Sequence, residues 1–230
     1  LELVDEGIIS MDRINEAVGN VLRVKFNIGL FSKKPLNVEE ASILVGDEKS
    51  KKIAKQLALE SLTLLKNDNN TLPLSKNLNS ILVTGTRANT KRHLCGGWTL
   101  GWASAKEEDL NCKTILDAIK EKVSKDTKIT YVEDVELLKL LNISKDDYDI
   151  CISVVGEEPH SEWLGDSMGM AMEAEEEALL RAAVDTKIPV VMVSIIGRPA
   201  QLVWANQHVS SILWAYLPGT EGAMPIAEVL

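Results

Sequence analysis

The chain has 230 residues, of which 45% are hydrophobic, and its 34 acidic and 25 basic residues give a formal net charge of −9. This composition is typical of a folded globular protein and excludes a disordered or collagen-like chain. The negative charge disfavours a nucleic-acid groove, which needs a basic face, and no apolar run is long enough to cross a bilayer. Neither a nucleic acid nor a membrane is therefore expected as a partner.

Three cysteines, Cys95, Cys112 and Cys151, stand at wide spacings. This odd number predicts neither a disulfide framework nor a zinc site, and combining the first two with His93 fits no closed tetrahedral geometry. Cys151 lies in an apolar run and is expected to be a buried small hydrophobe. We expect no metal and no cofactor, and the cysteines do not decide the cellular compartment.

The first part of the chain has a helical pattern. Ser10 is expected to cap a helix and Gly29 to close it. Residues 1–31 are thus a predicted helical appendage, residues 32–48 an irregular linker, and residues 49–230 the main domain. Since the chain opens inside a helical pattern without an initiator Met and its last predicted helix is cut at Leu230, we expect both ends to lie within a longer protein.

From residue 49 onward, short β-rich runs alternate with amphipathic segments, and several of the runs are apolar throughout, as strands covered on both faces must be. The predicted strands are residues 62–66, 80–85, 128–132, 149–155, 189–196 and 211–216. The predicted helices are residues 49–59, 114–123, 135–141, 172–185, 200–206 and 221–230. This alternation predicts an α/β fold: a mostly parallel open sheet with helices on both faces, an α/β sandwich.

Ligands of open parallel sheets bind beyond the carboxyl ends of the strands, where this chain carries unusual loops. If the strands at 80–85 and 149–155 are neighbours, their loops meet and bring Trp98, on a Gly-rich turn, close to a group of carboxyls. An indole packs against the C–H face of a sugar, and paired glycines would present it without steric cost. A carboxyl beside Trp163 would be partly desolvated, which raises its pKa toward the range of a general acid.

By this reasoning alone several carboxyls compete for the role of the acid: Glu157, Glu158, Glu162 and Asp166. Trp98 also has a second interpretation, as a loop aromatic that plugs the core of its own domain. Residue type and spacing alone leave open both the identity of the acid and the role of Trp98.

Two strings resolve this ambiguity through a family resemblance. Cys-Gly-Gly-Trp-Thr stands at 95–99 and Gly-Glu-x-Pro-x-x-Glu-x-x-Gly-Asp at 156–166. With the segments at 58–67, 72–74, 197–199 and 217–222, they resemble the second domain of glycoside hydrolase family 3, the β-glucosidase and β-glucan exohydrolase family, most strongly the plant exohydrolase type. Residues 7–31 resemble the last helix of that family's barrel domain, so the resemblance covers essentially the whole chain in order.

The resemblance implies a divided catalytic apparatus. It places the acid/base at Glu162 and a substrate-stacking role at Trp98, while the nucleophilic Asp belongs to a barrel domain that is missing here. A retaining glycosidase needs two carboxyls about 5–5.5 Å apart, so the active site would lie between the two domains. The resemblance thus implies an exo-acting enzyme that hydrolyses β-D-glucosidic bonds of β-glucosides or β-glucan oligosaccharides, inactive as this fragment, and it favours a secreted or periplasmic location over a cytoplasmic one.

Further polar residues on these loops have expected supporting roles. Glu157 is expected to hold the loop by accepting backbone N–H bonds, Asp166 to make a turn, and His160 to be a hydrogen-bonded structural residue. Arg198 is expected to bond carbonyls at strand ends. Trp163 departs from the polar residue of the exohydrolase loop, and either alters substrate selection or packs the loop.

Other charged runs have simpler interpretations. The segment 91–93 is expected to be a solvated basic spot or to pair with carboxylates of the missing domain. The acidic run at 173–177 is expected to be the solvated start of a helix, and Thr220 with Glu221 the capped start of another.

Two other classes of function remain as alternatives. A non-catalytic carbohydrate-binding module would explain why the chain holds only part of a catalytic site. A flavodoxin-like signalling or cofactor domain would rest on the strand–helix alternation alone, and no Gly-x-Gly-x-x-Gly or Walker loop follows any predicted strand.

Overall fold

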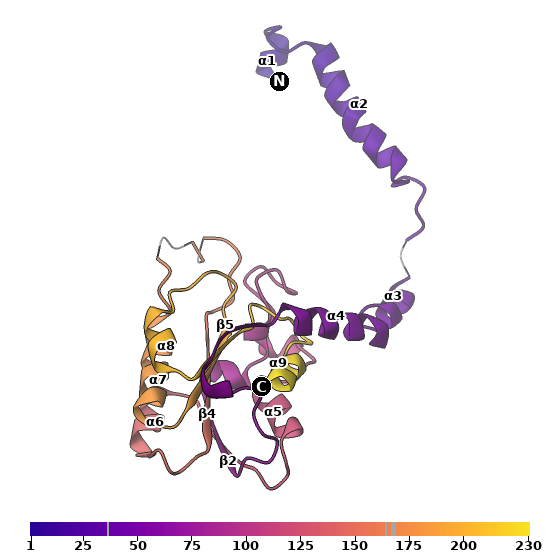
Figure 1. The fold of residues 1–230 in the computed structure, drawn as a ribbon. Coiled ribbons are helices and arrows are strands. Elements are labelled where there is room, and N and C mark those ends of the chain that lie inside the picture. The colour runs from indigo at the N-terminus through magenta and orange to yellow at the C-terminus, as the bar shows by residue number, and fades with distance from the viewer. Residues whose placement is uncertain (36, 164, 167–168) are drawn as a thin grey trace. The chain divides into compact units, whose positions relative to one another are not determined.

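The computed structural model describes residues 1–35, 37–163, 165–166 and 169–230. These residues form two compact units, Leu1–Asp47 and Glu48–Leu230 (Figure 1). Throughout the described residues, no helix combines the length and the apolar character that a membrane span requires.

The first unit contains the helices α1 (Glu2–Asp5), α2 (Met11–Asn27) and α3 (Val38–Leu44). The predicted cap of α2 is confirmed, because Ser10 accepts a hydrogen bond from the backbone of Arg13 at 3.2 Å. Gly29 ends the helix with a φ of 69°, and the backbone N–H of Leu30 donates to the carbonyl of Lys25 at 3.0 Å. This pair of features is a Schellman ending, which satisfies carbonyls that the last turn leaves free.

Helix α3 corrects the expectation that the segment around residues 36–48 is irregular. The side chain of Asn37 accepts hydrogen bonds from the backbone N–H groups of Glu39 and Glu40, at 3.0 and 3.3 Å. The first backbone N–H groups of a helix have no partner inside it, and an Asn before the helix satisfies them. This cap explains why a helix of only seven residues forms here.

The second unit is built on a six-stranded sheet with the order β1-β6-β5-β4-β2-β3. All six predicted strands are present: β1 (Thr63–Asn67), β2 (Ser80–Thr84), β3 (Lys128–Val132), β4 (Ile150–Gly156), β5 (Val190–Ile195) and β6 (Ser211–Trp214). Every pair is parallel except β1 with β6, which is antiparallel. The predicted mostly parallel α/β fold is therefore confirmed.

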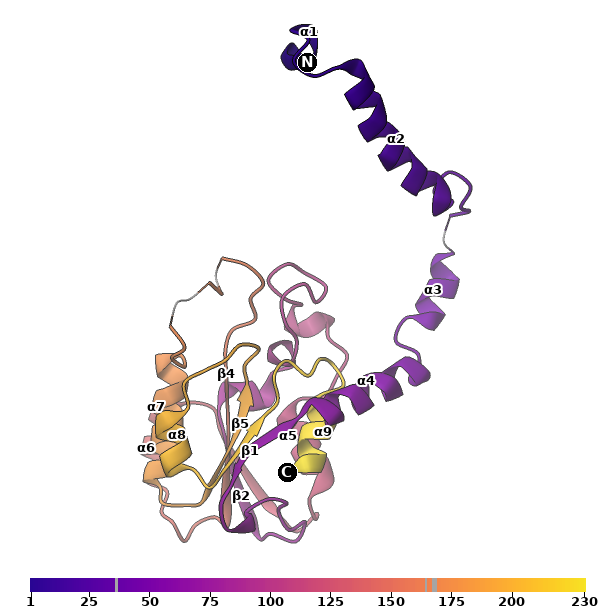
Figure 2. The same ribbon diagram turned by 45° about the horizontal axis from the view of Figure 1, so that its top comes forward.

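Helices cover both faces of this sheet: α5 and α9 on one face, α6, α7 and α8 on the other (Figures 1 and 2). The helices of the unit are α4 (Glu48–Ser61), α5 (Ile115–Lys122), α6 (Val135–Leu140), α7 (Ala174–Asp185), α8 (Val203–His208) and α9 (Ala223–Val229). Short 3-10 turns connect them at Asp68–Asn70, Thr86–Asn89, Arg92–Leu94 and Glu107–Asp109.

The strand β4 shows why its sequence is apolar at almost every position. Its side chains alternate between the two faces, so Ile152 and Val154 join the core under α5 and α9, whereas Cys151 and Val155 join the core under α6 and α7. Cys151 is fully buried, as predicted, and this burial raises the pKa of its thiol to about 12.

Three predicted helices start two or three residues too early, and one of them is α7, which begins at Ala174 and not at residue 172. α9 begins at Ala223 after Gly222, which makes no side-chain cap, so Thr220 and Glu221 do not start the helix. α8 begins at Val203, three residues after the predicted start at Ala200. Residues 200–202 and 221–222, which the apolar pattern assigned to these helices, still belong to the segments that connect them to β5 and β6.

Gly85, directly after β2, provides a test of this packing. Its φ is 104°, and a Cβ placed there would lie 2.1 Å from the carbonyl oxygen of Val154. We expect Gly85→Ala to lower the free energy of unfolding by about 3 kcal/mol or more, because left-handed strain and a backbone clash add together.

The matched control is Gly219→Ala, where φ is 76° and nothing lies within 4 Å of the added Cβ. That variant should lose only the left-handed cost of about 1–2 kcal/mol. Urea unfolding followed by Trp fluorescence measures both, and equal losses would contradict the assigned clash.

Candidate functional site

The two loops that the sequence singled out lie at one edge of the sheet. β2 and β4 are parallel neighbours, with Ile81 beside Ile150 and Thr84 beside Ser153. β2 also pairs with β3, and β4 pairs with β5 on its other side. The strand order therefore reverses between β2 and β4, and such a point is where open α/β sheets form a ligand crevice.

The turn that carries Trp98 touches the loop that carries Glu162. A Cβ at Gly97 would lie 2.6 Å from the Cβ of Ser161 and 2.7 Å from the carbonyl oxygen of His160. The hydroxyl of Ser161 also donates to the carbonyl of Trp102 at 2.8 Å. The two loops thus pack directly against each other.

The glycines before Trp98 allow the two loops to approach each other closely. The sequence predicts a different role for them, which is to present the indole without steric cost. Neither Gly96 nor Gly97 has a positive φ, whereas Trp98 itself has a φ of 64°. The indole is therefore presented by its own left-handed backbone, while Gly97 leaves room for the neighbouring loop.

The side chains of this region face solvent. Trp98 is 69% exposed, so it does not plug the core of the domain, and Glu162 is exposed as well. Trp163 is 76% exposed, and its ring lies edge-on to that of Trp102 with 5.9 Å between centroids. The described residues of this chain therefore do not supply the desolvation that was expected around a loop carboxyl. Position 164 of the string lies outside the described residues.

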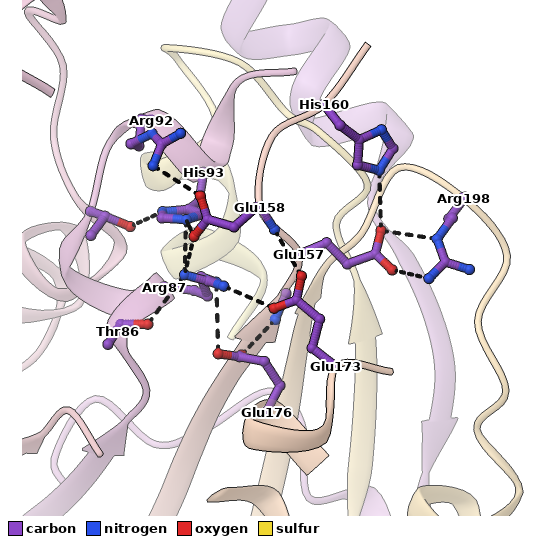
Figure 3. Close-up of polar contacts among 12 residues, drawn as sticks. Thr86, Arg87, Arg92, His93, Glu157, Glu158, His160, Glu173, Glu176 and Arg198 are labelled. Atoms are coloured by element: carbon purple, nitrogen blue, oxygen red, sulfur yellow. Dashed lines mark hydrogen bonds and ion pairs between the residues drawn. The ribbon is translucent and has the colours of Figure 1, made fainter. Parts of the chain in front are cut away.

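Glu157 is buried, and its partners are side chains (Figure 3). Arg198 pairs with both of its carboxylate oxygens, with Nη2 2.5 Å from Oε1 and Nε 3.2 Å from Oε2. His160 approaches the same carboxylate, with Nε2 3.7 Å from Oε2. The expectation that Glu157 accepts backbone N–H bonds is thus corrected to a two-point ion pair with an arginine.

Arg198 also reaches the far end of the same loop. It donates to the carbonyls of Gly169 at 2.9 Å and Ala171 at 3.3 Å. It therefore does bond carbonyls, as predicted, but those of the loop between β4 and α7 and not those of strand ends. Near the tip, the backbone N–H of Asp166 donates to the carbonyl of Trp163 at 2.9 Å, which closes a turn as expected.

A second arginine, Arg87, lies on the other side of β4 and escaped the sequence analysis. It is buried, and its guanidinium lies 3.0 Å from Glu158, 3.2 Å from Glu173 and 3.7 Å from Glu176 (Figure 3). Glu176 is also buried and accepts a hydrogen bond from the backbone of Gly156 at 2.9 Å. The expectation that the acidic start of α7 is solvated is therefore wrong for Glu176, whereas Glu173 is exposed and still pairs with Arg87.

Two residues of the basic spot at 91–93, Arg92 and His93, belong to this cluster, and the expectation that the spot is solvated is wrong for the buried His93. Arg92 pairs with Glu158 at 2.9 Å, and Lys91 donates to the carbonyl of Leu110 at 3.0 Å. His93 is buried, with Nδ1 2.6 Å from the hydroxyl of Thr90 and Nε2 2.9 Å from both Arg87 and Glu158. Both ring nitrogens are occupied, and within the described ranges no group of three His, Cys, Asp or Glu could hold a metal ion.

Burial and pairing shift the pKa values within this cluster in different directions. Burial lowers the pKa of His93, and the charges of Arg87 and Arg92 lower it further, against the opposing effect of Glu158. Burial acts to raise the pKa of Glu158, but the bond with His93 and the two arginines together bring it below its ordinary value. Burial raises the pKa of Glu176 despite the partial opposition of Arg87. The cluster is thus held together by charge pairing in partly dry surroundings.

An exposed indole and an exposed carboxyl thus lie on two touching loops at the crevice of an α/β sandwich. Residues 62–230 match the family model described as the Glycosyl hydrolase family 3 C-terminal domain. The chain belongs to this family, which sets aside the flavodoxin-like alternative.

Known proteins related to this chain agree with the family. It is 34% identical to the lysosomal beta glucosidase of Dictyostelium discoideum, over all of this chain and 30% of that protein. It is 26% identical to a beta-xylosidase of Formosa agariphila, over 96% of this chain and 32% of the relative. The exo-1,3/1,4-beta-glucanase ExoP of a Pseudoalteromonas species superposes with a TM-score of 0.82 at 31% identity, over 99% of this chain and 28% of that one. The chain thus spans about a third of the length of the curated relatives it matches.

The buried His93 makes the stability of the second unit depend on pH. The pKa of His93 is lowered in the native state. As the pH falls below about 6.5, His93 therefore binds a proton in the unfolded chain but stays neutral in the native state. We expect the free energy of unfolding to decrease from about pH 7.5 to about pH 5.5, and His93→Gln to reduce that decrease.

Urea titrations at the two pH values measure this difference. His208→Gln, which replaces an exposed imidazole at the end of α8, is the matched control and should retain the full decrease. An unchanged decrease in His93→Gln would show that another group is responsible.

Proposed function

We propose that this chain supplies the general acid/base, Glu162, and one wall of the sugar site to a retaining, exo-acting β-glucosidase or β-glucan exohydrolase. The observation that carries the proposal is the direct packing of the Glu162 loop against the Trp98 turn through Gly97. The family string at 156–166 selects Glu162 among the carboxyls of the loop, and Glu157 and Glu158 are already committed to arginines.

The role follows from the chemistry of double displacement. A nucleophilic carboxylate attacks the anomeric carbon while the carboxyl of Glu162 gives its proton to the departing glycosidic oxygen. The resulting carboxylate of Glu162 then takes a proton from the water that cleaves the glycosyl–enzyme ester. The nucleophile belongs to a barrel domain outside these residues, so we expect the 230-residue chain by itself to be inactive.

That barrel domain is the proposed partner of the exposed rim. Glu162 and Trp98 both face solvent, whereas an acid catalyst works best where water is excluded. A second domain closing over the rim would bury both groups around a sugar ring. In this proposal residues 1–31 are the end of the barrel and residues 32–48 the linker, and the exposed Val18 and Val21 of α2 would pack within the barrel.

The substrate class is a β-glucoside or β-glucan oligosaccharide. The lysosomal beta glucosidase and the exo-1,3/1,4-beta-glucanase support glucose as the sugar, and the beta-xylosidase among the relatives makes a xyloside the natural comparison substrate. Trp98 would offer its exposed face to the apolar side of the sugar.

A carbohydrate-binding module without catalysis is the second candidate, favoured by the large exposed face of Trp98 on a loop packed in place. Isothermal titration of the 230-residue chain with laminaribiose separates the two. Measurable binding by this chain alone supports the module, and absence of binding supports a site that needs both domains.

Replacement of the acid/base tests the proposal directly. In the full-length enzyme, Glu162→Ala should lower kcat/KM for cellobiose by about a hundredfold or more, because its leaving group needs a proton. Dinitrophenyl β-glucoside should still form the glycosyl–enzyme, since its leaving group needs none, and azide should restore turnover by attacking that intermediate without a general base.

Asp166→Asn, which removes a charge from the same loop, serves as the control and should show neither the dependence on the leaving group nor the rescue by azide. Full turnover of cellobiose by Glu162→Ala would reject the assignment.

The contact between the two loops gives an independent test. Gly97→Ala places a methyl group 2.6 Å from Ser161 and should push the Trp98 turn away from the Glu162 loop. We expect kcat/KM to fall about tenfold or more, since small misplacements in an active site are costly. Gly219→Ala, with open space around the new Cβ, should leave kcat/KM unchanged, and equal kinetics of the two variants would contradict the coupling of the loops.

A further inference from the structure

The loop that carries Glu162 is held at both ends by arginines from the two neighbouring strands. This loop, residues 157–173, joins β4 to α7. In the sheet, β4 lies between β5 and β2. Arg198 follows β5 and Arg87 follows β2, so one arginine lies on each side of the end of β4 (Figure 3).

Arg198 joins the first and the last part of the loop. Its guanidinium pairs with Glu157 at the beginning and donates to the carbonyls of Gly169 and Ala171 near the end. A guanidinium presents five N–H donors in one rigid plane, which allows one side chain to hold a carboxylate and two carbonyls together. An ammonium group has three donors on a flexible stem and lacks this fixed geometry.

Arg87 makes the corresponding connection on the other side. It pairs with Glu158 at the beginning of the loop and with Glu173 at its end. The consecutive carboxylates Glu157 and Glu158 therefore pair with arginines on opposite sides of β4. The base of the loop is closed by two ion-paired bridges, and Glu162 lies between their attachment points.

Glu162 depends on this base because its own side chain is exposed. Further contacts of the loop near Glu162 include the bond from Ser161 to Trp102, the ring of Trp163 against that of Trp102, and the ring of His160, whose Nδ1 would lie 2.0 Å from a Cβ at Gly165. His160 in turn approaches Glu157. Through His160, the part of the loop next to Glu162 is thus linked to the carboxylate that Arg198 holds.

We propose that Arg198 is a positioning residue for the acid/base carboxyl, because it holds together the two ends of the loop that carries Glu162. This inference rests on the proposed function of Glu162. Arg198 is a more specific probe than Arg87, since Arg198 contacts the loop at Glu157, Gly169 and Ala171, whereas Arg87 also pairs with Glu176 of α7.

The dependence on the leaving group distinguishes positioning of an acid from general damage. In the full-length enzyme, Arg198→Met should lower kcat/KM for cellobiose by about tenfold to a hundredfold. For dinitrophenyl β-glucoside, which needs no proton donor, the loss should be much smaller. Arg198→Lys keeps a charge for Glu157 but not the planar set of donors, so its selectivity between the two substrates should lie between Arg198→Met and the wild type.

Two controls isolate the effect. Arg181→Met removes another arginine ion pair of the same unit, with Glu177 on α7, and should leave the ratio of the two kcat/KM values unchanged. In a Glu162→Ala background no acid remains to be positioned, so adding Arg198→Met should lower kcat/KM for nitrophenyl β-glucoside no further.

Equal losses for both substrates, or an additive loss in the Glu162→Ala background, would overturn the positioning role. If Arg198→Met does not fold, the substrate ratio of Arg198→Lys decides: a ratio shifted against cellobiose supports the proposal, and the wild-type ratio overturns it. If Glu162→Ala alone leaves cellobiose turnover intact, the proposed function itself fails, and the two failures are thereby distinguished.

Discussion

The pairing of buried carboxylates with two arginines at the end of β4 is the interaction on which the site depends. Glu157 and Arg87 are both buried, and a buried charge without a partner is strongly destabilising. Glu157 therefore requires Arg198, and Arg87 requires the carboxylates around it. These ion pairs connect the segments that follow β2, β4 and β5. They therefore fix the two ends of the long loop between β4 and α7.

The same arrangement leaves the proposed acid/base and the proposed stacking indole exposed to solvent. The paired carboxylates lie at the base of the loop, whereas Glu162 and Trp98 face solvent. The charges that hold the structure together are thus separate from the carboxyl proposed as the acid/base. In the proposed enzyme, closure by a second domain would complete the surroundings of the free carboxyl without disturbing the pairs beneath it.

The strands were predictable because local sequence carries their physical cause. β4 and β5 are buried on both faces, so nearly every side chain must be apolar, and no partner needs to be known to recognise this. The cap of α2 by Ser10 is equally local. The starts of α8 and α9 were misplaced. Near them a Cβ added at Gly197 would lie 2.7 Å from the side chain of Leu217, and one added at Gly222 would lie 2.4 Å from that of Pro218, and the apolar pattern does not reveal this close packing.

By itself, the sequence determined the order of strands and helices and the family strings, because both are written in local spacing and residue type, and through the family resemblance it gave the proposed choice of Glu162. The tertiary structure alone decided that Arg87 lies among Glu158, Glu173 and Glu176. These residues come from three separate segments, and solvated and buried charges look alike in a sequence until the sheet places their partners side by side.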